Sequence, residues 1–227
     1  MTDPRIIVAI DTFNLKQANV ILDQLDPDLC MVKIGSVVFN ALGKSFLRDV
    51  SLRGFKIFLD LKLHDIPNTV HETILGFYDC SIEMLTVHLS GGEEMLKKSM
   101  LAGKSINAKV IGVSILTSLK ESDSLALFDN GLDDQIRNLF KIAAQVNLDG
   151  VVCSPHELEM SKTILEPNSI KITPGIRDVK VADDQARTMS AKEAVEKGAT
   201  FLVIGRPITQ AQDISSALNN FSDLINE

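Results

Sequence analysis

The sequence predicts an α/β protein built as a (β/α)8 TIM barrel, a closed ring of parallel strands surrounded by helices. Eight short apolar segments recur along the 227 residues, and each is followed by helical periodicity or by a helix-start signal. Continuous apolar strands that alternate with helices are typical of a parallel sheet covered by helices. Eight such units without a break in composition fit one barrel, so residues 1–227 are expected to form a single domain.

A doubly wound open sheet is the alternative arrangement of alternating strands and helices. Such a sheet usually carries a glycine-rich fingerprint directly after its first strand. Residues 11–14 here read Asp-Thr-Phe-Asn and contain no glycine. The barrel is therefore favoured.

The first half of the chain contains four strand-and-helix units. The strands are expected at 5–11, 31–35, 55–63 and 83–89. The helices are expected at 15–25, 37–47 and 68–81, with a fourth from 92 to about 103. The third helix follows an Ile-Pro-Asn turn, which places Asn68 near its N-cap.

The second half repeats the same alternation. Its strands are expected at 109–116, 150–153, 169–176 and 200–206. A longer polar loop separates the first of them from a helix near 133–147. Ser-x-x-Glu patterns at Ser154 and at Ser190 predict two further helix starts, and a closing helix is expected after Pro207.

Composition limits the class of protein. Thirty acidic residues against 23 basic ones give a net charge of −7, which argues against nucleic acid as a partner. No apolar run is long enough to span a bilayer, and the first residues lack the pattern of a secretion signal, so a soluble cytoplasmic protein is expected. Cys30, Cys80 and Cys153 are odd in number, widely spaced and set among apolar residues, which is typical of reduced core thiols.

Charged residues gather at the expected ends of the first three strands. Asp60 and Lys62 are two residues apart in the third strand, so their side chains share a face, and Asp65 follows the strand end. Asp11 ends the first strand and Lys33 lies near the end of the second. Barrel enzymes carry their active sites at the carboxyl ends of the strands. A structural ion pair is the simpler interpretation of Asp60 and Lys62 alone, but the whole set favours a functional charge network.

The eighth unit contains the sequence Gly205-Arg206-Pro207. Barrels often bind phosphate after their last two strands, where backbone N–H groups at a helix start face the anion. Gly205 permits close approach of the backbone, Arg206 offers a bidentate guanidinium, and Arg177 and Gln185 in the preceding loop are placed to close over the same group. A helix start with a surface arginine is the alternative. A metal site at Asp60, His64 and His88 is conceivable, but no ligand pattern of fixed spacing supports it.

The segment 60–69, Asp-Leu-Lys-Leu-His-Asp-Ile-Pro-Asn-Thr, resembles the signature of the orotidine 5′-phosphate decarboxylase family, whose members make UMP in pyrimidine synthesis. The resemblance extends along the whole chain. It includes the segments 8–11, 32–35, 116–118, 173–177 and 203–207. The ten-residue signature is highly specific, whereas each of the other segments is weaker.

The resemblance implies a role for each matching residue. Lys33, Asp60, Lys62 and Asp65 would form a charged array in which Lys62 donates a proton. The implied assembly is a homodimer with shared active sites, to which Asp65 and Thr69 are contributed across the interface. Further implied contacts are Asp11 and Lys33 with the ribose, Thr117 and Ser118 with the pyrimidine, and Arg177, Gln185, Gly205 and Arg206 with the phosphate.

The implied chemistry fits these residue types without a metal or an organic cofactor. Loss of CO₂ from C6 of the pyrimidine leaves an in-plane carbanion, which an ammonium group aimed at C6 would stabilise and then protonate. A metal-dependent sugar-phosphate decarboxylase of similar architecture also resembles the Asp-x-Lys-x-x-Asp pattern, but the Ile-Pro-Asn-Thr continuation argues against it. A barrel that binds a nucleotide without turnover is the alternative from another class.

Overall fold

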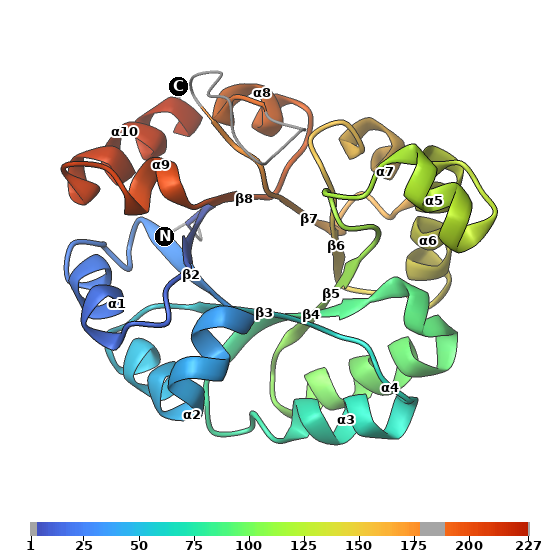
Figure 1. The fold of residues 1–227 in the computed structure, drawn as a ribbon, viewed down its shortest axis with the longest axis horizontal. Coiled ribbons are helices and arrows are strands. Elements are labelled where there is room, and N and C mark those ends of the chain that lie inside the picture. Colours follow the sequence, from blue (N-terminus) through green and yellow to red (C-terminus); the bar gives the residue numbers. More distant parts are fainter. Residues whose placement is uncertain (1–3, 178–188, 227) are drawn as a thin grey trace.

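Eight parallel strands close into a barrel in the order β1 to β8, as the sequence predicts. The structure is a computed structural model and describes residues 4–177 and 189–226. Each strand pairs with the next, and β8 pairs with β1. Figure 1 shows this ring with the helices outside it. The strands are β1 (Ile6–Ile10), β2 (Cys30–Gly35), β3 (Ile57–Leu63), β4 (Ile82–His88), β5 (Lys109–Val113), β6 (Gly150–Val152), β7 (Ile170–Thr173) and β8 (Phe201–Ile204).

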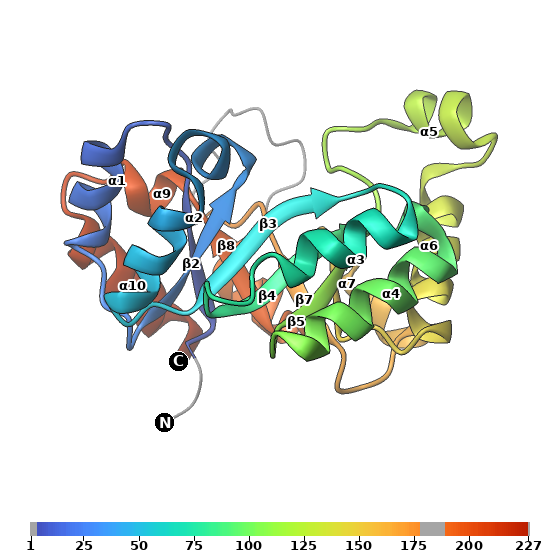
Figure 2. The ribbon, with the colours of Figure 1, turned by 90° about the horizontal axis from the view of Figure 1, so that it is seen from below.

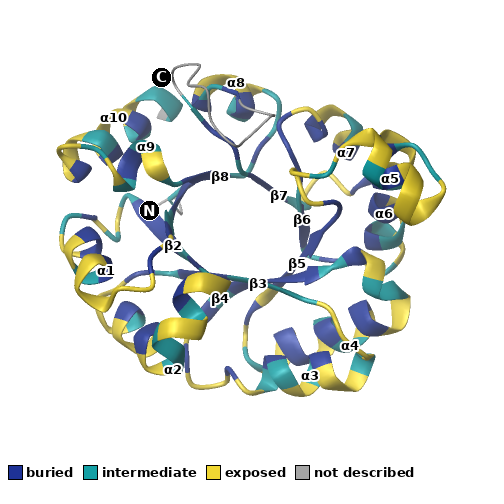
Figure 3. Cartoon of the chain, in the orientation of Figure 1, coloured by how far each residue is buried: buried dark blue, intermediate teal, exposed yellow. Residues whose placement is uncertain are grey.

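The helices cover the outside of the ring with their apolar faces turned inward. In Figure 3 the sides that face the strands are buried and the outer sides are exposed. Apolar residues recur with the helical period, so each helix has one face to bury. The helices are α1 (Leu15–Leu22), α2 (Ser36–Leu52), α3 (Pro67–Leu75), α4 (Gly92–Ser105), α5 (Glu121–Phe128), α6 (Leu132–Gln145), α7 (Leu158–Ile164), α8 (Ala191–Glu196), α9 (Arg206–Thr209) and α10 (Ile214–Asn226).

The strands supply two apolar cores because successive side chains point to opposite faces. In β1, for example, Ile6 and Val8 pack in the large core between strands and helices, whereas Ile7 packs in the barrel interior. The interior core is a layer with contributions from nearly every strand. Its buried members are Ile7, Met31, Phe58, Met84, Ile111, Ile172 and Val203. This layer closes the centre of the barrel, so a ligand can enter only above or below it.

Helix α5 lies within the segment that we expected to be a polar loop. In Figure 2 it stands apart from the barrel, on the side to which the arrows of β2 and β3 point. Leu125 and Leu127 on this helix are 51% and 64% exposed. The helix has little apolar surface against the barrel, so its sequence has no clear buried face from which to predict it.

Two predicted helix starts differ from the observed ones. Helix α3 begins at Pro67, one residue before the predicted start, with Ile66 as its N-cap, because proline has a helical φ and no N–H to satisfy. Helix α7 begins at Leu158, because Ser154 and Glu157 close a turn before it. The hydroxyl of Ser154 donates to the Glu157 carboxylate at 2.6 Å.

The predicted start at Ser190 is confirmed, since its hydroxyl accepts from the backbone N–H of Glu193.

The three cysteines are buried free thiols, as predicted. Burial and the nearby Asp26 raise the pKa of Cys30 to about 12. Burial likewise raises the pKa of Cys153 to about 12. Among the described residues, no helix combines the length and apolar character needed to cross a membrane.

Candidate active site

A cavity of about 460 Å³ opens at the carboxyl ends of the strands, directly above the interior apolar layer. Its walls follow from the alternation of side chains, because the residue two positions after each core residue again points inward. Met31 is thus followed by Lys33, and Phe58 by Asp60. Further lining residues are Ala9, Asp11, Lys62, Thr117, Pro174, Arg177, Gly205 and Arg206.

Three members of the predicted charge network, Lys33, Asp60 and Lys62, lie together at one side of this cavity. Both carboxylate oxygens of Asp60 accept hydrogen bonds from Nζ of Lys62 at 2.8 Å. Nζ of Lys33 lies 3.5 Å from Oδ2 of the same carboxylate. The side chains of Asp60, Lys33 and Lys62 are 11%, 18% and 34% exposed, so the pairs are only partly screened by water.

Opposing effects set the ionisation of Asp60. Its burial is the largest single influence and raises the pKa. The ammonium groups of Lys33 and Lys62 and a hydrogen bond from Thr86 act in the other direction and together outweigh it. The pKa of Asp60 therefore lies below its ordinary value of 3.8, and the group is a carboxylate at neutral pH.

Gly35 leaves room for the lysine of the second strand. A β-carbon on this residue would lie 3.2 Å from Nζ of Lys33, closer than ordinary van der Waals contact. A side chain at this position would require the ammonium group to shift by a few tenths of an ångström. The glycine at the end of β2 is thus part of what places Lys33 in the cavity.

The predicted phosphate-binding residues lie on the opposite side of the cavity, after β7 and β8. Arg177, Gly205 and Arg206 line it. Gln185, also predicted for the phosphate, lies outside the described residues. Thr209 and Gln210, at the end of α9, line the cavity as well and were not predicted from the sequence. They follow Arg206 by about one helical turn, which is the signal that would have identified them.

Several predicted residues lie away from this cavity. Asp65 and Thr69 are exposed, and neither is among the described residues that line it. A carboxylate oxygen of Asp65 accepts from the N–H of Ile66 at 2.7 Å, and Ile66 is itself 68% exposed. Ser118 also is not among the described lining residues, whereas Thr117 is.

His64 and His88 lie next to the charge network but do not form a metal site with it. Their ring centroids are 5.4 Å apart. Burial lowers the pKa of His88, and the nearby His64 and Lys62 lower it further, so this imidazole is neutral at neutral pH. Within the described part of the chain, no group of three or more His, Cys, Asp or Glu residues is arranged to hold a metal ion.

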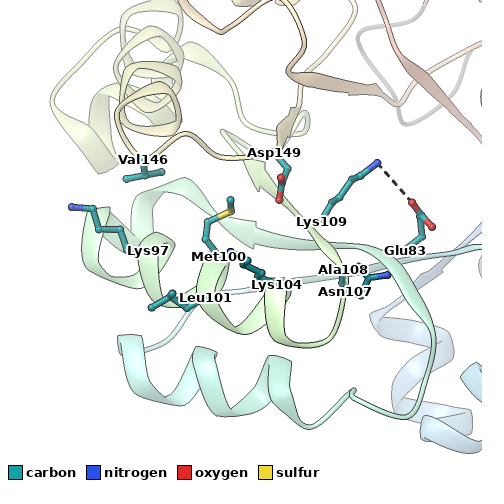
Figure 4. A pocket seen from close by; sticks show the side chains of 10 residues that line it. All are labelled: Glu83, Lys97, Met100, Leu101, Lys104, Asn107, Ala108, Lys109, Val146 and Asp149. Carbon is teal, nitrogen blue, oxygen red and sulfur yellow. Dashed lines mark ion pairs between the residues drawn. The ribbon is translucent and has the colours of Figure 1, made fainter.

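A second and larger cavity, of about 770 Å³, lies at the opposite end of the barrel. In Figure 4, Lys109 forms an ion pair with Glu83 on one side of this cavity. Lys97 and Val146 line the other side. It is formed at the starts of β4 and β5 and the end of α4. Its lining contains none of the predicted site residues, so size alone does not identify the active site here.

Comparison with known proteins identifies the family of the chain. Residues 4–221 match the model of a protein family described as "Orotidine 5'-phosphate decarboxylase / HUMPS family". The chain belongs to this family. The orotidine 5′-phosphate decarboxylase of Psychromonas ingrahamii is 40% identical over 231 residues, which cover 98% of this chain and 97% of the relative. That of Actinobacillus pleuropneumoniae serotype 5b is 41% identical over 225 residues, covering 97% and 98%.

A solved structure of the same family has the same fold. The crystal structure of orotidine 5′-phosphate decarboxylase from Lactobacillus acidophilus superposes with a TM-score of 0.88 at 34% sequence identity. The match covers 99% of this chain and 100% of that one. The barrel and its strand order are therefore those of the orotidine 5′-phosphate decarboxylase family.

Proposed function

We propose that the protein decarboxylates orotidine 5′-phosphate to UMP, the last step of UMP synthesis, without a metal or organic cofactor. The observation that carries this proposal is the position of the Lys62 ammonium group, held by both oxygens of Asp60 at the wall of the strand-end cavity. An acid fixed in this way can donate a proton to a bound substrate. Membership of the family and its close relatives support the choice of substrate.

The reaction needs one bond to break and one to form. The bond between C6 and the carboxylate carbon breaks, CO₂ leaves, and the electron pair remains on C6. Nζ of Lys62 then gives a proton to C6, which completes UMP and leaves a neutral amine to be reprotonated. The positive charges of Lys62 and Lys33 stabilise the carbanion as it develops, because they are already oriented before the reaction.

The rest of the nucleotide would be held away from the reacting carbon. We assign Asp11 and Lys33 to the ribose hydroxyls, and Thr117 and Ser118 to the pyrimidine. The phosphate is assigned to the other side of the cavity, to Arg177, Gln185, Gly205 and Arg206. Binding energy from the phosphate then positions the ring over Lys62.

We further propose that the active form is a cytoplasmic homodimer with two shared sites. Asp65 and Thr69 are exposed at the start of α3, beside Ile66, and do not line the described cavity of their own chain. A two-fold partner would receive these residues in its site and contribute its own in return. Asp65 of one chain would thus complete the array that contains Lys62 of the other.

The test is a direct assay of UMP formation from orotidine 5′-phosphate after exhaustive treatment with EDTA. Turnover that survives this treatment supports the proposal. Loss of turnover that Mg²⁺ restores would contradict the metal-free mechanism, and turnover of a sugar phosphate with Mg²⁺ in place of orotidine 5′-phosphate would favour a metal-dependent sugar-phosphate decarboxylase. Tight binding of UMP without any turnover would identify a nucleotide-binding barrel instead.

A further inference from the structure

The end of β3 does not follow the regular ladder with β4. Leu59 pairs with Leu85, and the next pair is Leu63 with Val87. Three residues of β3, from Asp60 to Lys62, therefore stand opposite the single residue Thr86 of β4. Such a bulge bends the strand and redirects its side chains.

The bulge places Lys62 in an unusual backbone conformation. Its φ is 51°, in the left-handed region that residues with a β-carbon seldom adopt. A residue in this conformation at a functional site needs its surroundings to hold it there. Because the register between β3 and β4 shifts here, the backbone N–H of Lys62 has no regular carbonyl partner on β4.

The Thr86 hydroxyl supplies that partner and reaches the other half of the ion pair. It accepts a hydrogen bond from the N–H of Lys62 at 2.8 Å and donates one to Oδ1 of Asp60 at 3.1 Å. One hydroxyl can do both, since it has one hydrogen and two lone pairs. Thr86 is fully buried, so water does not compete for either bond.

We propose that Thr86 is a positioning residue for the decarboxylation, which holds the backbone of Lys62 and the carboxylate of Asp60 in one fixed arrangement. This inference rests on the proposed function. Thr86 is not among the described residues that line the cavity, and it acts on the reaction only through its two neighbours. Loss of its hydroxyl should therefore affect the chemical step more than the binding of the nucleotide.

Threonine suits this position for two reasons. It follows Met84 by two residues, so it lies directly above the interior apolar layer, where its methyl group can pack. Its hydroxyl then faces the bulge of the neighbouring strand. Valine has the same shape without the hydroxyl, and it would leave the Lys62 N–H and one Asp60 oxygen without this partner.

The experiment compares Thr86→Val with Thr86→Ser in the full-length enzyme, with kcat and KM measured separately from UMP formation. A displacement of the reacting group by about 1 Å can lower the rate about 100-fold, so we expect Thr86→Val to lose about 10- to 100-fold in kcat. Its KM should stay close to that of the wild type. Thr86→Ser keeps the hydroxyl and should retain most of kcat.

Thr173→Val is the matched control. Thr173 is also a fully buried threonine on a barrel strand, but its hydroxyl bonds to neither Lys62 nor Asp60. Its substitution should leave kcat near the wild-type value. Equal losses of kcat in Thr86→Val and Thr173→Val would overturn the proposal, because they would reflect disturbed packing.

Three other results would also overturn it: an unchanged kcat in Thr86→Val, equal losses in the valine and serine variants, and a loss confined to KM. If Thr86→Val does not fold, Thr86→Cys replaces it, since a thiol fills the site but is a poor hydrogen-bond donor. Wild-type kcat in the cysteine variant would then refute the role of the hydroxyl. Absence of turnover in the wild-type enzyme would refute the proposed function itself, which separates the two failures.

Discussion

Lys62 binds both carboxylate oxygens of Asp60 through a single nitrogen, at 2.8 Å from each. The two residues are two positions apart in β3, within the segment where its register with β4 shifts. The contact fixes the ammonium group of Lys62, the proposed proton donor, before any ligand arrives. It also holds the carboxylate of Asp60 as a fixed negative charge at the wall of the cavity.

Lys62→Ala should abolish decarboxylation while UMP binding is retained. The variant loses the proposed general acid and the positive charge proposed to stabilise the carbanion, and kcat should fall by ~10³-fold or more. The phosphate and ribose contacts remain. Calorimetric titration measures the binding of UMP, and a turnover assay measures decarboxylation. Lys16→Ala, on the exposed surface of α1, is the control. Loss of UMP binding together with turnover would contradict the separation of roles.

Arg206→Ala should weaken the binding of phosphorylated ligands and have little effect on the unphosphorylated nucleoside. A hydrogen bond to a charged group contributes about 1.5–3 kcal/mol, which corresponds to about a 10- to 100-fold change in Kd. The measurement is the Kd of UMP and of uridine for each variant. Arg53→Ala is the control, because that arginine binds Asp23 on the outside of the barrel. Equal losses for the two ligands would remove Arg206 from the phosphate site.

Mixed dimers test the shared site. Lys62→Ala and Asp65→Asn homodimers should each be nearly inactive. After the two are mixed, unfolded and refolded, half of the dimers should be hybrids, each with one doubly altered site and one intact site. Activity should then recover to roughly a quarter of the wild-type value, from the two-fold symmetry. A mixture that stays inactive, although hybrids are shown to form, would place Asp65 in the site of its own chain.

The pH dependence of stability should depend on Asp60. Its pKa in the folded protein is below the ordinary value of 3.8, so the folded state favours its ionised form more than the unfolded state does. This contribution is complete above the unfolded pKa and is lost as the pH falls through the lower, folded pKa. Wild type should therefore be more stable than Asp60→Asn at pH 5 to 7, and the difference should shrink below about pH 4. Urea unfolding at several pH values measures it, and a difference independent of pH would contradict the argument.

The cysteines should be unreactive in the folded protein. Burial raises the pKa of Cys30 and of Cys153 to about 12, so almost no thiolate is present at pH 8. Burial also raises the pKa of Cys80. A disulfide reagent such as DTNB should titrate no thiol in the native protein and three after denaturation. Rapid reaction of one native thiol would show that its segment opens readily.

The barrel and most of the charged residues that line its cavity could be predicted, because they follow from patterns within short stretches of sequence. Alternating apolar strands and helices predict the eight units, and the strand ends predict that Asp11, Lys33 and Asp60 line one cavity. Details that depend on tertiary contact could not be predicted. Ser154 and Ser190 have the same local pattern, yet Ser190 begins a helix whereas Ser154 closes a buried turn.

The role of Thr86 likewise could not be predicted from the sequence, because it depends on tertiary contacts. In the sequence it is an ordinary β-branched residue of a buried strand. Its contacts arise only from the shifted register between β3 and β4, and no short pattern specifies that shift. The left-handed backbone conformation of Lys62 could not be predicted from the sequence either, since nothing in a lysine residue favours it.

The closure of the barrel has a consequence for the time at which a newly made chain becomes functional. Lys33 and Asp60 come from early strands, while Gly205 and Arg206 follow the last one. These two groups face the same cavity because β8 pairs with β1, where Ile7 is opposite Val203. A chain still on the ribosome therefore contains Lys33 and Asp60 well before Gly205 and Arg206 can reach the cavity. The site is completed only when the final strand has been synthesised and has docked.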